Sequence, residues 1–468
     1  MAALLAGVCS RLEAGGKTVA RVSISAAAEL KGYPVLIPLT PAPVPRGTPA
    51  LRSPDGGRTD GQLVRIEGRD FVAALVDLPG SGARAVYEVS FDASPVRGAS
   101  RLEVRPEDEA LAVYAGDSLI ARHNSTHPFK PYLWPVFSPG GVDVTRSYPM
   151  RDVPGEDQDH VHHRGLWFTH GDVNGLDFWG EGEPKGRTVQ RSVSVSSGPV
   201  CAVIRTVNDW VAPDGRKICE DERTQVFWKT PAGNVIDYRI TLKATEGAVR
   251  LGDTKEGTFA IRVPKWMTVK NGTGHILNSA GDRDGAAWGK RAAWVIYWGP
   301  SAAGSTGVAM AEDPQNFRFP TYWHARDYGL FAANPFGVRD FTGDKDRDGS
   351  IEIPAGGSLT LAYRVLVFDG DNAGRSAALR GKEYFLQEHR RYFLPGAHLS
   401  SLKGALEGDL HAKVVLLPAG HDPDTLVQRE GRDGLLKRVR QAQPFMEFVF
   451  DAEAEGHDLG SVQGKLAY

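Results

Sequence analysis

The chain has 468 residues, which is long for a single hydrophobic core and predicts two or three domains. A hydrophobic content of 41%, a charged content of 24% and a net charge of −2 are typical of a soluble globular protein. This balance argues against a protein built mainly to neutralise nucleic-acid phosphates or to coat a membrane.

The three cysteines, Cys9, Cys201 and Cys219, have no metal-ligand spacing and are too few for a disulfide framework. No apolar run approaches the roughly 20 residues that a membrane helix needs. We therefore expect a protein of a reducing compartment, the cytoplasm.

Residues 1–115 predict an N-terminal β-sandwich region. Apolar and polar residues alternate there in short runs, separated by Pro and Gly clusters that break strands. The expected strands are Thr18–Ile24, Tyr33–Leu39, Gln62–Glu67, Phe71–Val76, Tyr87–Phe91 and Ala110–Tyr114.

Residues 116–368 predict the main β-sandwich, with longer strands and many glycines and prolines to turn them. The overall expectation is a mainly β chain whose large antiparallel sheets stack face to face. The expected strands are Arg191–Val195, Val200–Trp210, Arg216–Trp228, Val235–Leu242, Phe259–Val263, Ala293–Trp298 and Leu359–Phe368.

Residues 369–468 change character and predict a C-terminal α/β tail. Helix-forming residues fill 372–394 and 424–442, and a short apolar strand, Val414–Leu417, lies between them. Strands that alternate with helices are typical of an α/β unit.

A His-rich stretch at residues 159–179 is the strongest chemical signal in the chain. His160, His162, His163 and His170 fall within eleven residues, and Arg146 lies shortly before them. If the segment is extended, His160 and His162 share one face and His163 points the other way. Three interpretations stay open: hydrogen bonding within a loop, a metal site of His160, His162 and a carboxylate, or acid/base and substrate-binding work.

A second segment, 316–337, mixes aromatic rings with Arg, Asp, Asn and His side chains. Flat apolar rings suit the C–H faces of a sugar, and planar polar groups suit its hydroxyls. The alternative is an aromatic core edge in which Arg326 and Asp327 pair for structural reasons.

Two shorter runs are also candidates. In Gly252–Gly257, Lys255 or Glu256 could reach the same pocket as an acid/base or ion-pairing group, or could form a solvated turn. In the tail, Asp369, Asp371, Asp422 and Asp424 are carboxylates of the kind that hold Mg²⁺; a strand-to-helix turn capped by Asp371 is the alternative.

Over about residues 15–366 the chain resembles the soluble bacterial family labelled PmoA-like, a label that refers to methane oxygenase. The resemblance rests on Arg146-Ser-Tyr-Pro149, His162-His-Arg-Gly-Leu-Trp167, Gly171-Asp-Val-Asn-Gly175, Asp253-Thr-Lys-Glu-Gly257 and Trp323-His-Ala-Arg-Asp-Tyr-Gly329. It implies a β-sandwich related to the mutarotase-like sugar-binding folds, in a setting of carbohydrate catabolism.

The tail resembles a different family, the later half of the Toprim metal-binding domain of bacterial DNA primase. The matching residues are Asp369-Gly-Asp-Asn-Ala-Gly374 and Leu417-Pro-Ala-Gly-His-Asp-Pro-Asp424. The Glu-Gly motif and the zinc-binding and basic segments of such primases have no counterpart upstream. The resemblance therefore implies a half domain, joined near residues 367–369 as a natural fusion or by recombination.

These signals together predict a carbohydrate-active enzyme, a glycoside hydrolase, lyase or epimerase, with His163, His324 and Glu256 as acid/base groups. A small-molecule carbohydrate is the expected partner, and a divalent metal is the cofactor that the residues suggest. Alternatives are a non-catalytic sugar-binding protein, a metal-dependent oxygenase that holds iron or copper, and nucleic-acid processing by the tail, which is the least favoured. The expected substrate-binding residues are Arg146, Arg164, Trp167, His170, Asp172, Asn174, Trp323, Arg326, Asp327 and Asn334.

Overall fold

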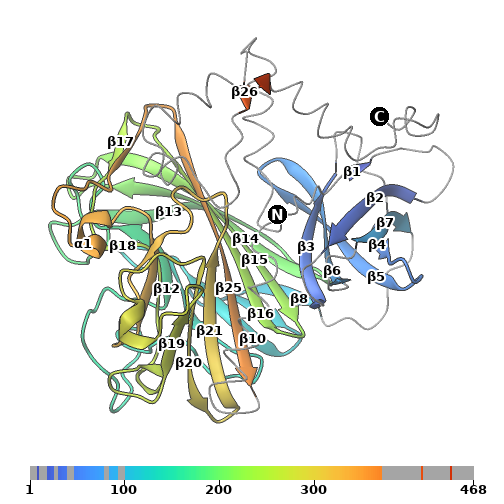
Figure 1. Cartoon of the computed structure of the whole chain (residues 1–468), viewed down its shortest axis with the longest axis horizontal. Helices are drawn as coiled ribbons and strands as arrows, with labels where there is room; N and C mark the ends of the chain where they lie inside the picture. Colours follow the sequence, from blue (N-terminus) through green and yellow to red (C-terminus); the bar gives the residue numbers. More distant parts are fainter. Residues whose placement is uncertain are drawn as a thin grey trace. The chain divides into compact units, whose positions relative to one another are not determined.

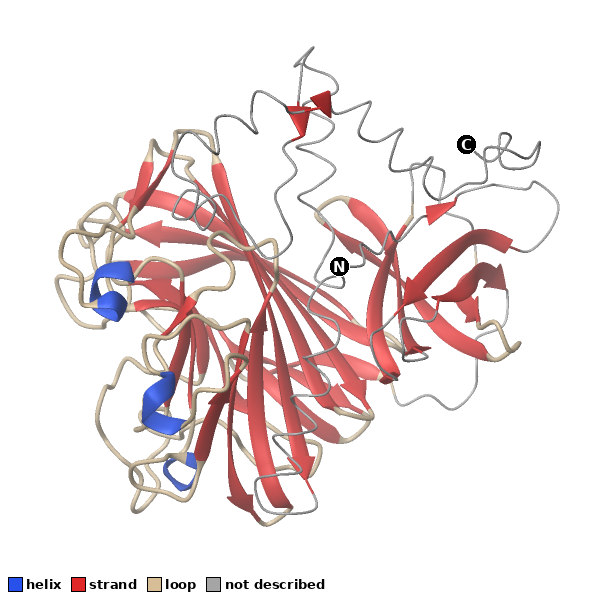
Figure 2. Cartoon of the chain, viewed as in Figure 1, coloured by secondary structure: helices blue, strands red, loops and turns tan. Residues whose placement is uncertain are grey.

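The structure is a computed structural model that describes residues 8–9, 18–25, 30–39, 47–78, 84–92, 101–370, 413–414 and 443–444. β-Strands dominate this part of the chain, as Figure 2 shows. The helical elements found there are α1 (Val338–Thr342) and two 3-10 turns, η1 (Lys265–Met267) and η2 (Asp284–Ala287). In the part of the chain so described, no helix has the length and apolar character needed to cross a membrane.

The first large sheet has eight antiparallel strands. Its order is β22 (Tyr322–Trp323), β23 (Leu330–Asn334), β18 (Gly257–Arg262), β12 (Leu166–His170), β11 (Tyr132–Val136), β10 (Ser118–Asn124), β9 (Ala110–Ala115) and β8 (Leu102–Glu107). Because β8 pairs with β9, and β9 pairs with β10, this sheet starts before residue 116.

The second large sheet also has eight antiparallel strands (Figure 1). Its order is β13 (Arg187–Ser196), β14 (Cys201–Val211), β15 (Lys217–Thr230), β16 (Gly233–Lys243), β25 (Ser358–Gly370), β21 (Gly304–Glu312), β20 (Trp294–Ser301) and β19 (His275–Asn278). The late strand β25 therefore lies in the middle of the sheet, between β16 and β21.

The two sheets share one apolar core and form a sandwich. Phe168 and Phe259 from the first sheet belong to the same buried cluster as Phe227, Ile236 and Tyr363 from the second. The predicted mainly β architecture with large antiparallel sheets is confirmed. Strand alternation explains it, since every second side chain faces the other sheet.

A third sheet of seven antiparallel strands precedes the sandwich. Its order is β1 (Val8–Cys9), β2 (Thr18–Ser25), β7 (Arg84–Asp92), β4 (Thr48–Arg52), β5 (Arg58–Ile66), β6 (Arg69–Leu78) and β3 (Leu30–Pro38). Val35 and Val72 of this sheet share a second apolar cluster with Trp228, Trp298 and Leu366. Part of the outer face of the second large sheet is thus covered, whereas edge strand β13 is largely exposed.

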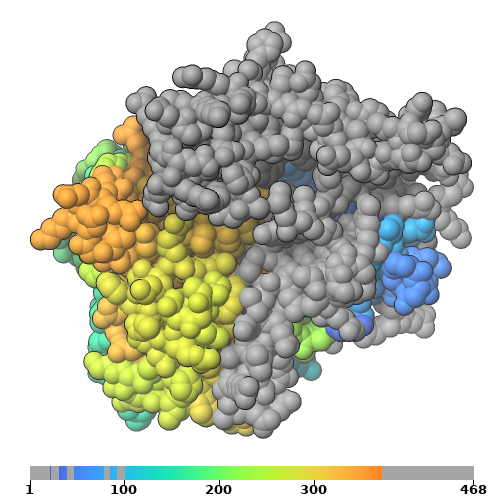
Figure 3. Space-filling view, in the orientation of Figure 1, coloured from blue at the N-terminus to red at the C-terminus, as the bar shows by residue number. Residues whose placement is uncertain are grey.

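Smaller elements complete the described structure. β17 (Val249–Leu251) pairs with β24 (Ile351–Ile353), and the segment that carries α1 forms the orange surface region in Figure 3. In the tail, β26 (Lys413–Val414) pairs with β27 (Gln443–Pro444), within a separate compact unit. The two helices predicted for the tail lie outside the described residues.

Candidate active site

One open pocket collects the three candidate segments of the sandwich. Its cavity volume of about 550 Å³ falls in the range typical of small-molecule sites. The lining residues are His160, His162, His163, Asp177, Trp179, Gly180, Glu181, Lys185, Lys255, Glu256, His324, Arg326 and Tyr328. The loops before β12, after β12, before β18 and after β22 supply them, so the first large sheet positions the whole pocket.

An aromatic cluster that supports the pocket lies on the outer face of the first sheet. Trp167, Trp179 and Tyr328 pack in a small cluster that is separate from the core between the sheets. Trp167 and Phe168 are neighbours in β12 and belong to different clusters, because successive side chains of a strand point to opposite faces. The sequence thus builds part of the core and part of the support beneath the pocket from one strand.

A column of stacked rings runs through the His-rich loop. The ring of His160 lies between those of Tyr328, with centroids 5.3 Å apart, and His163, with centroids 4.7 Å apart. His163 in turn stacks on Trp167 at 5.4 Å. The chain turns at residues 161–162, and the His163 amide donates to the His160 carbonyl. The segment is therefore not extended, and His160, His162 and His163 all line one pocket instead of facing opposite sides.

Two buried arginines hold this loop in place. Arg262 of β18 and Arg146 both donate to Asp159, and Arg146 also donates to the His160 carbonyl at 2.8 Å. Burial would raise the pKa of Asp159, but Arg262, His160 and Arg146 outweigh it and hold that pKa below its usual value. The carboxylate therefore stays ionised and fixes the loop to the sheet.

His163 has a defined tautomer. Its Nδ1 lies 3.1 Å from Nη1 of Arg262, and a guanidinium can only donate, so Nδ1 accepts and Nε2 carries the proton. Burial is the largest cause that lowers the pKa of His163 well below its usual value, and the neighbouring His162 and Arg262 act in the same direction. His163 is thus a neutral imidazole with an Nε2–H donor.

His324 has the opposite tautomer. Its Nδ1 lies 3.0 Å from the carbonyl oxygen of Lys255, which can only accept, so the proton is on Nδ1 and Nε2 keeps its lone pair. Burial lowers the pKa of His324 to about 4, and the positive charges of Arg326 and Lys255 act in the same direction. The pocket therefore contains one neutral histidine with a donor Nε2 and one with an acceptor Nε2.

Helix α1 and Asn334 fix the segment that carries Lys255 and Glu256. Asp340 accepts from the Lys255 amide at 2.9 Å, and Asn334 Nδ2 donates to the Thr254 carbonyl at 2.8 Å. Lys255 Nζ lies 3.5 Å from Glu256 Oε1, and both side chains are partly exposed. Glu256 is thus held at the pocket wall by its backbone while its carboxylate remains reachable.

A second group of charged side chains lies at another wall of the pocket. Glu181 accepts from both Nε and Nη2 of Arg164, at 2.8 and 2.9 Å, and lies 3.5 Å from Nζ of Lys130. Burial would raise the pKa of Glu181, but Arg164 and Lys130 hold it below its usual value. Lys130 also donates to the carbonyls of His162 and Trp179, so it joins the two loops that flank the wall.

Several residues predicted to bind substrate support the pocket from behind instead of lining it. Arg146, Arg164 and Trp167 take the supporting roles given above. Trp323 is buried and donates from Nε1 to the Ala292 carbonyl at 2.7 Å. Arg326 and Asp327 form no ion pair, and only Arg326 lines the pocket.

Asp172 and Asn174 lie in a turn away from the lining residues. Asp172 Oδ1 accepts from the Gly175 amide at 2.9 Å, and Asp172 lies 3.6 Å from Arg250. Asn174 accepts from the Arg250 amide at 2.7 Å. These two side chains order the loop after β12.

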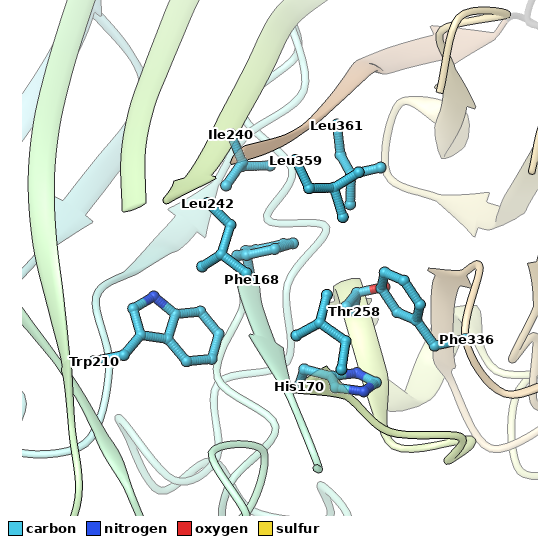
Figure 4. Close-up of a pocket in the computed structure, with 10 residues that line it drawn as sticks. Phe168, His170, Trp210, Ile240, Leu242, Thr258, Phe336, Leu359 and Leu361 are labelled. Atoms are coloured by element: carbon cyan, nitrogen blue, oxygen red, sulfur yellow. The ribbon is translucent and has the colours of Figure 1, made fainter. Parts of the chain in front are cut away.

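His170 faces the interior of the sandwich rather than the open pocket. It lines a small, mostly apolar void of about 10 Å³ together with Phe168, Thr258 and Phe336 (Figure 4). Its Nε2 donates to the Gly252 carbonyl at 2.8 Å, and burial lowers its pKa to about 4. His170 thus ties the segment before β18 to β12.

The predicted metal ligands are placed as follows. His160 and His162 line the pocket, but nowhere in the described residues do three or more His, Cys, Asp or Glu side chains form a group that could hold a metal ion. Asp369, at the end of β25, accepts from Thr306 and from the Gly140 amide, each at 2.6 Å. The other predicted metal ligands, Asp371, Asp422 and Asp424, lie outside the described residues.

Sequence reasoning missed four charged residues of the site: Lys130, Glu181, Lys185 and Arg262. Two signals could have identified them. Arg262 interrupts the apolar strand Phe259–Val263, where a lone charge needs a partner. Glu181 and Lys185 follow the His-rich stretch within a few residues.

Comparisons with known proteins give two kinds of match. A family model described as a family of unknown function (DUF6807) matches residues 101–379. DNA primase of Legionella pneumophila is 35% identical over 103 residues, which is 22% of this chain and 15% of that protein. DNA primase of Escherichia coli K12 is 34% identical over 101 residues, 22% of this chain and 14% of that protein. The chain therefore spans only about one seventh of the length of these primases.

Proposed function

This chain belongs to the family of unknown function DUF6807, and we propose that it is an enzyme that acts on a sugar or glycoside by acid/base chemistry. The observation that carries the proposal is that His163, His324 and Glu256, from three distant segments, line the same pocket. The proposal also includes the PmoA-like resemblance with the mutarotase-like fold that it implies, and the cytoplasmic location expected from the cysteine content.

The pocket suits a sugar in size and in chemistry. Its volume of about 550 Å³ accommodates one or two sugar rings. Trp179 and Tyr328 offer aromatic surface to C–H groups, and the histidines, Glu256 and Lys185 offer donors and acceptors to hydroxyls.

The two tautomers assign complementary roles. Nε2 of His324 has a lone pair and is the candidate base that accepts a proton from the sugar. Nε2–H of His163 is the candidate donor to the sugar oxygen on which negative charge develops. Glu256, whose carboxylate is partly exposed, is the candidate second proton carrier. Cleavage, elimination and epimerisation each need such a pair.

The test is turnover of a panel of mono- and oligosaccharides, oxidised keto sugars included, by wild type and three variants. We expect His163→Ala and His324→Ala to lose at least 100-fold in kcat/KM, in line with the usual effect of an acid/base group. His275→Ala is the matched control, because His275 is more than half exposed and lies outside the pocket. Unchanged turnover in both pocket variants, with wild-type thermal unfolding, would reject the assignment.

A non-catalytic sugar-binding protein is the second candidate, and the same pocket favours it. It predicts saturable binding of a sugar without any product after long incubation at high protein concentration. Product formation that depends on His324 would exclude it.

The primase matches favour a separate proposal for the tail. We infer that the matching stretch is the tail after Asp369, where the Toprim motifs lie, and that any nucleic-acid function of this chain belongs to it. Gel-shift assays at rising salt would test this, since phosphate contacts weaken steeply with salt. The absence of any shift at low salt would reject it.

A further inference from the structure

Arg326 is the pocket cation that lacks a carboxylate partner. Its guanidinium lies 5.7 Å from the ring centroid of Trp288 and 5.3 Å from that of Tyr328. In the described part of the chain it has neither a side-chain ion pair nor a hydrogen bond from its guanidinium. The other two lining cations are paired, Lys185 with Asp177 and Lys255 with Glu256.

Two carboxylates beside the pocket are each shared by two cations, so neither is available to Arg326 alone. Asp159 is shared by two cations, Arg146 and Arg262. Glu181 is likewise shared by Arg164 and Lys130. The buried histidines of the pocket add no negative charge, because an imidazole is either neutral or positively charged.

An unpaired guanidinium in a partly enclosed pocket attracts an anion. The walls of the pocket exclude part of the bulk water, so a charge-assisted hydrogen bond there is stronger than on a flat surface. Trp288 and Tyr328 restrict the planar group, which leaves its paired N–H donors available in a fixed orientation.

We propose that Arg326 binds a carboxylate of the substrate, so that the ligand of this pocket is an acidic sugar such as a uronic acid or a glycoside of one. The inference rests on the proposed function and names the substrate class for it. A carboxylate is favoured because its two oxygens match the planar fork of one guanidinium.

A bound carboxylate also serves the chemistry of the neighbouring histidine. Burial is the main cause of the low pKa of His324, whose Nε2 is the candidate base, and the charge of Arg326 lowers that pKa further. A bound anion offsets that charge and raises the pKa of His324 towards neutrality, where a general base works best. The acidic substrate would thereby activate its own base.

The experiment is a calorimetric titration of the full chain with matched ligands. The ligands are the methyl glycosides of glucuronic and galacturonic acid, those of glucose and galactose, and glucose 6-phosphate. The variants are Arg326→Gln, Arg326→Lys and the control Arg105→Gln; Arg105 also stacks on a tyrosine, Tyr114, but lies in β8 outside the pocket. Thermal unfolding of each variant checks its fold.

We expect a uronide to bind wild type roughly tenfold or more tighter than its neutral counterpart, as a charge-assisted pair implies. Arg326→Gln should abolish that preference, Arg326→Lys should keep part of it, and Arg105→Gln should keep all of it. Equal binding of acid and neutral sugar overturns the inference but leaves the sugar function standing. Tighter binding of the phosphate overturns the choice of carboxylate. Binding of no sugar at all overturns the proposed function and, with it, this inference.

Discussion

At the scale of single residues, His163 and His324 of the pocket differ in what touches Nδ1. Arg262 donates to His163, and the Lys255 carbonyl accepts from His324. A guanidinium can only donate and a carbonyl can only accept, so each partner determines which ring nitrogen carries the proton. Two histidine side chains thus present a hydrogen-bond donor and a hydrogen-bond acceptor to the same cavity.

This difference is directly observable by NMR on protein labelled with ¹⁵N-histidine. We expect His163 to appear as the Nε2–H tautomer and His324 as the Nδ1–H tautomer at pH 7. Arg262→Met should remove the preference in His163, because its Nδ1 loses the donor, and should leave His324 unchanged. The same tautomer at both positions would contradict the roles assigned to them.

At the scale of elements, the entry into β12 depends on a glycine. Gly165 joins the His-rich loop to the strand with φ of +53°, and a Cβ there would lie 2.1 Å from the Leu133 carbonyl oxygen. Its own carbonyl accepts from the Arg262 amide at 2.9 Å. The backbone must therefore approach its neighbour closely at the point where the loop turns towards the pocket.

We expect Gly165→Ala to lower the free energy of unfolding by about 3 kcal/mol or more, since the clash adds to the cost of positive φ. Gly141→Ala is the matched control. Gly141 also has positive φ, of +79°, but nothing lies within 4 Å of its Cβ position. That variant should cost only about 1 kcal/mol in chemical denaturation. Equal losses would show that the close approach to Leu133 is unimportant.

At the scale of the whole molecule, burial keeps histidines neutral in several places. In five histidines, burial is the largest cause that lowers the pKa to about 4. They are His123, His127, His162, His170 and His324. An unfolded histidine has a pKa of about 6.5. Between these two values the unfolded chain binds more protons, so stability is fully present above about pH 6.5 and falls as the pH drops towards 4.

We therefore expect the melting temperature to fall steeply from pH 6.5 to pH 4.5. A histidine with these two pKa values contributes about 3 kcal/mol in total, of which about 2 kcal/mol is lost between pH 6.5 and pH 4.5. His324→Ala should make the fall shallower by removing one such group, and the exposed His275→Ala should not. Burial raises the pKa of Glu312, so this carboxyl group stabilises the fold as the pH falls. It therefore reduces the net loss of stability that the histidines cause. A melting temperature that stays flat over this window would contradict the burial argument.

How far the sequence predicts the fold depends on how local each signal is. The alternation of apolar and polar residues, with Gly and Pro clusters between the runs, located most long strands. This works because the pattern of one strand depends only on its own residues. β21 escaped detection because it is buried along nearly its whole length and so does not alternate. Strand order was also beyond the sequence, for example the pairing of β25 with β16 and β21.

The sequence by itself determined the mainly β architecture and the three segments that carry chemical side chains. Only the tertiary structure decided which of those side chains meet. Arg146, Trp167 and Trp323 support the pocket from behind, whereas Arg326, His163 and His324 line it. The physical reason is that a side chain has the same chemistry whether it lines the pocket or lies behind the lining residues. Its role depends on the face of the sheet it occupies and on partners far away in the chain, and long-range strand pairing sets both.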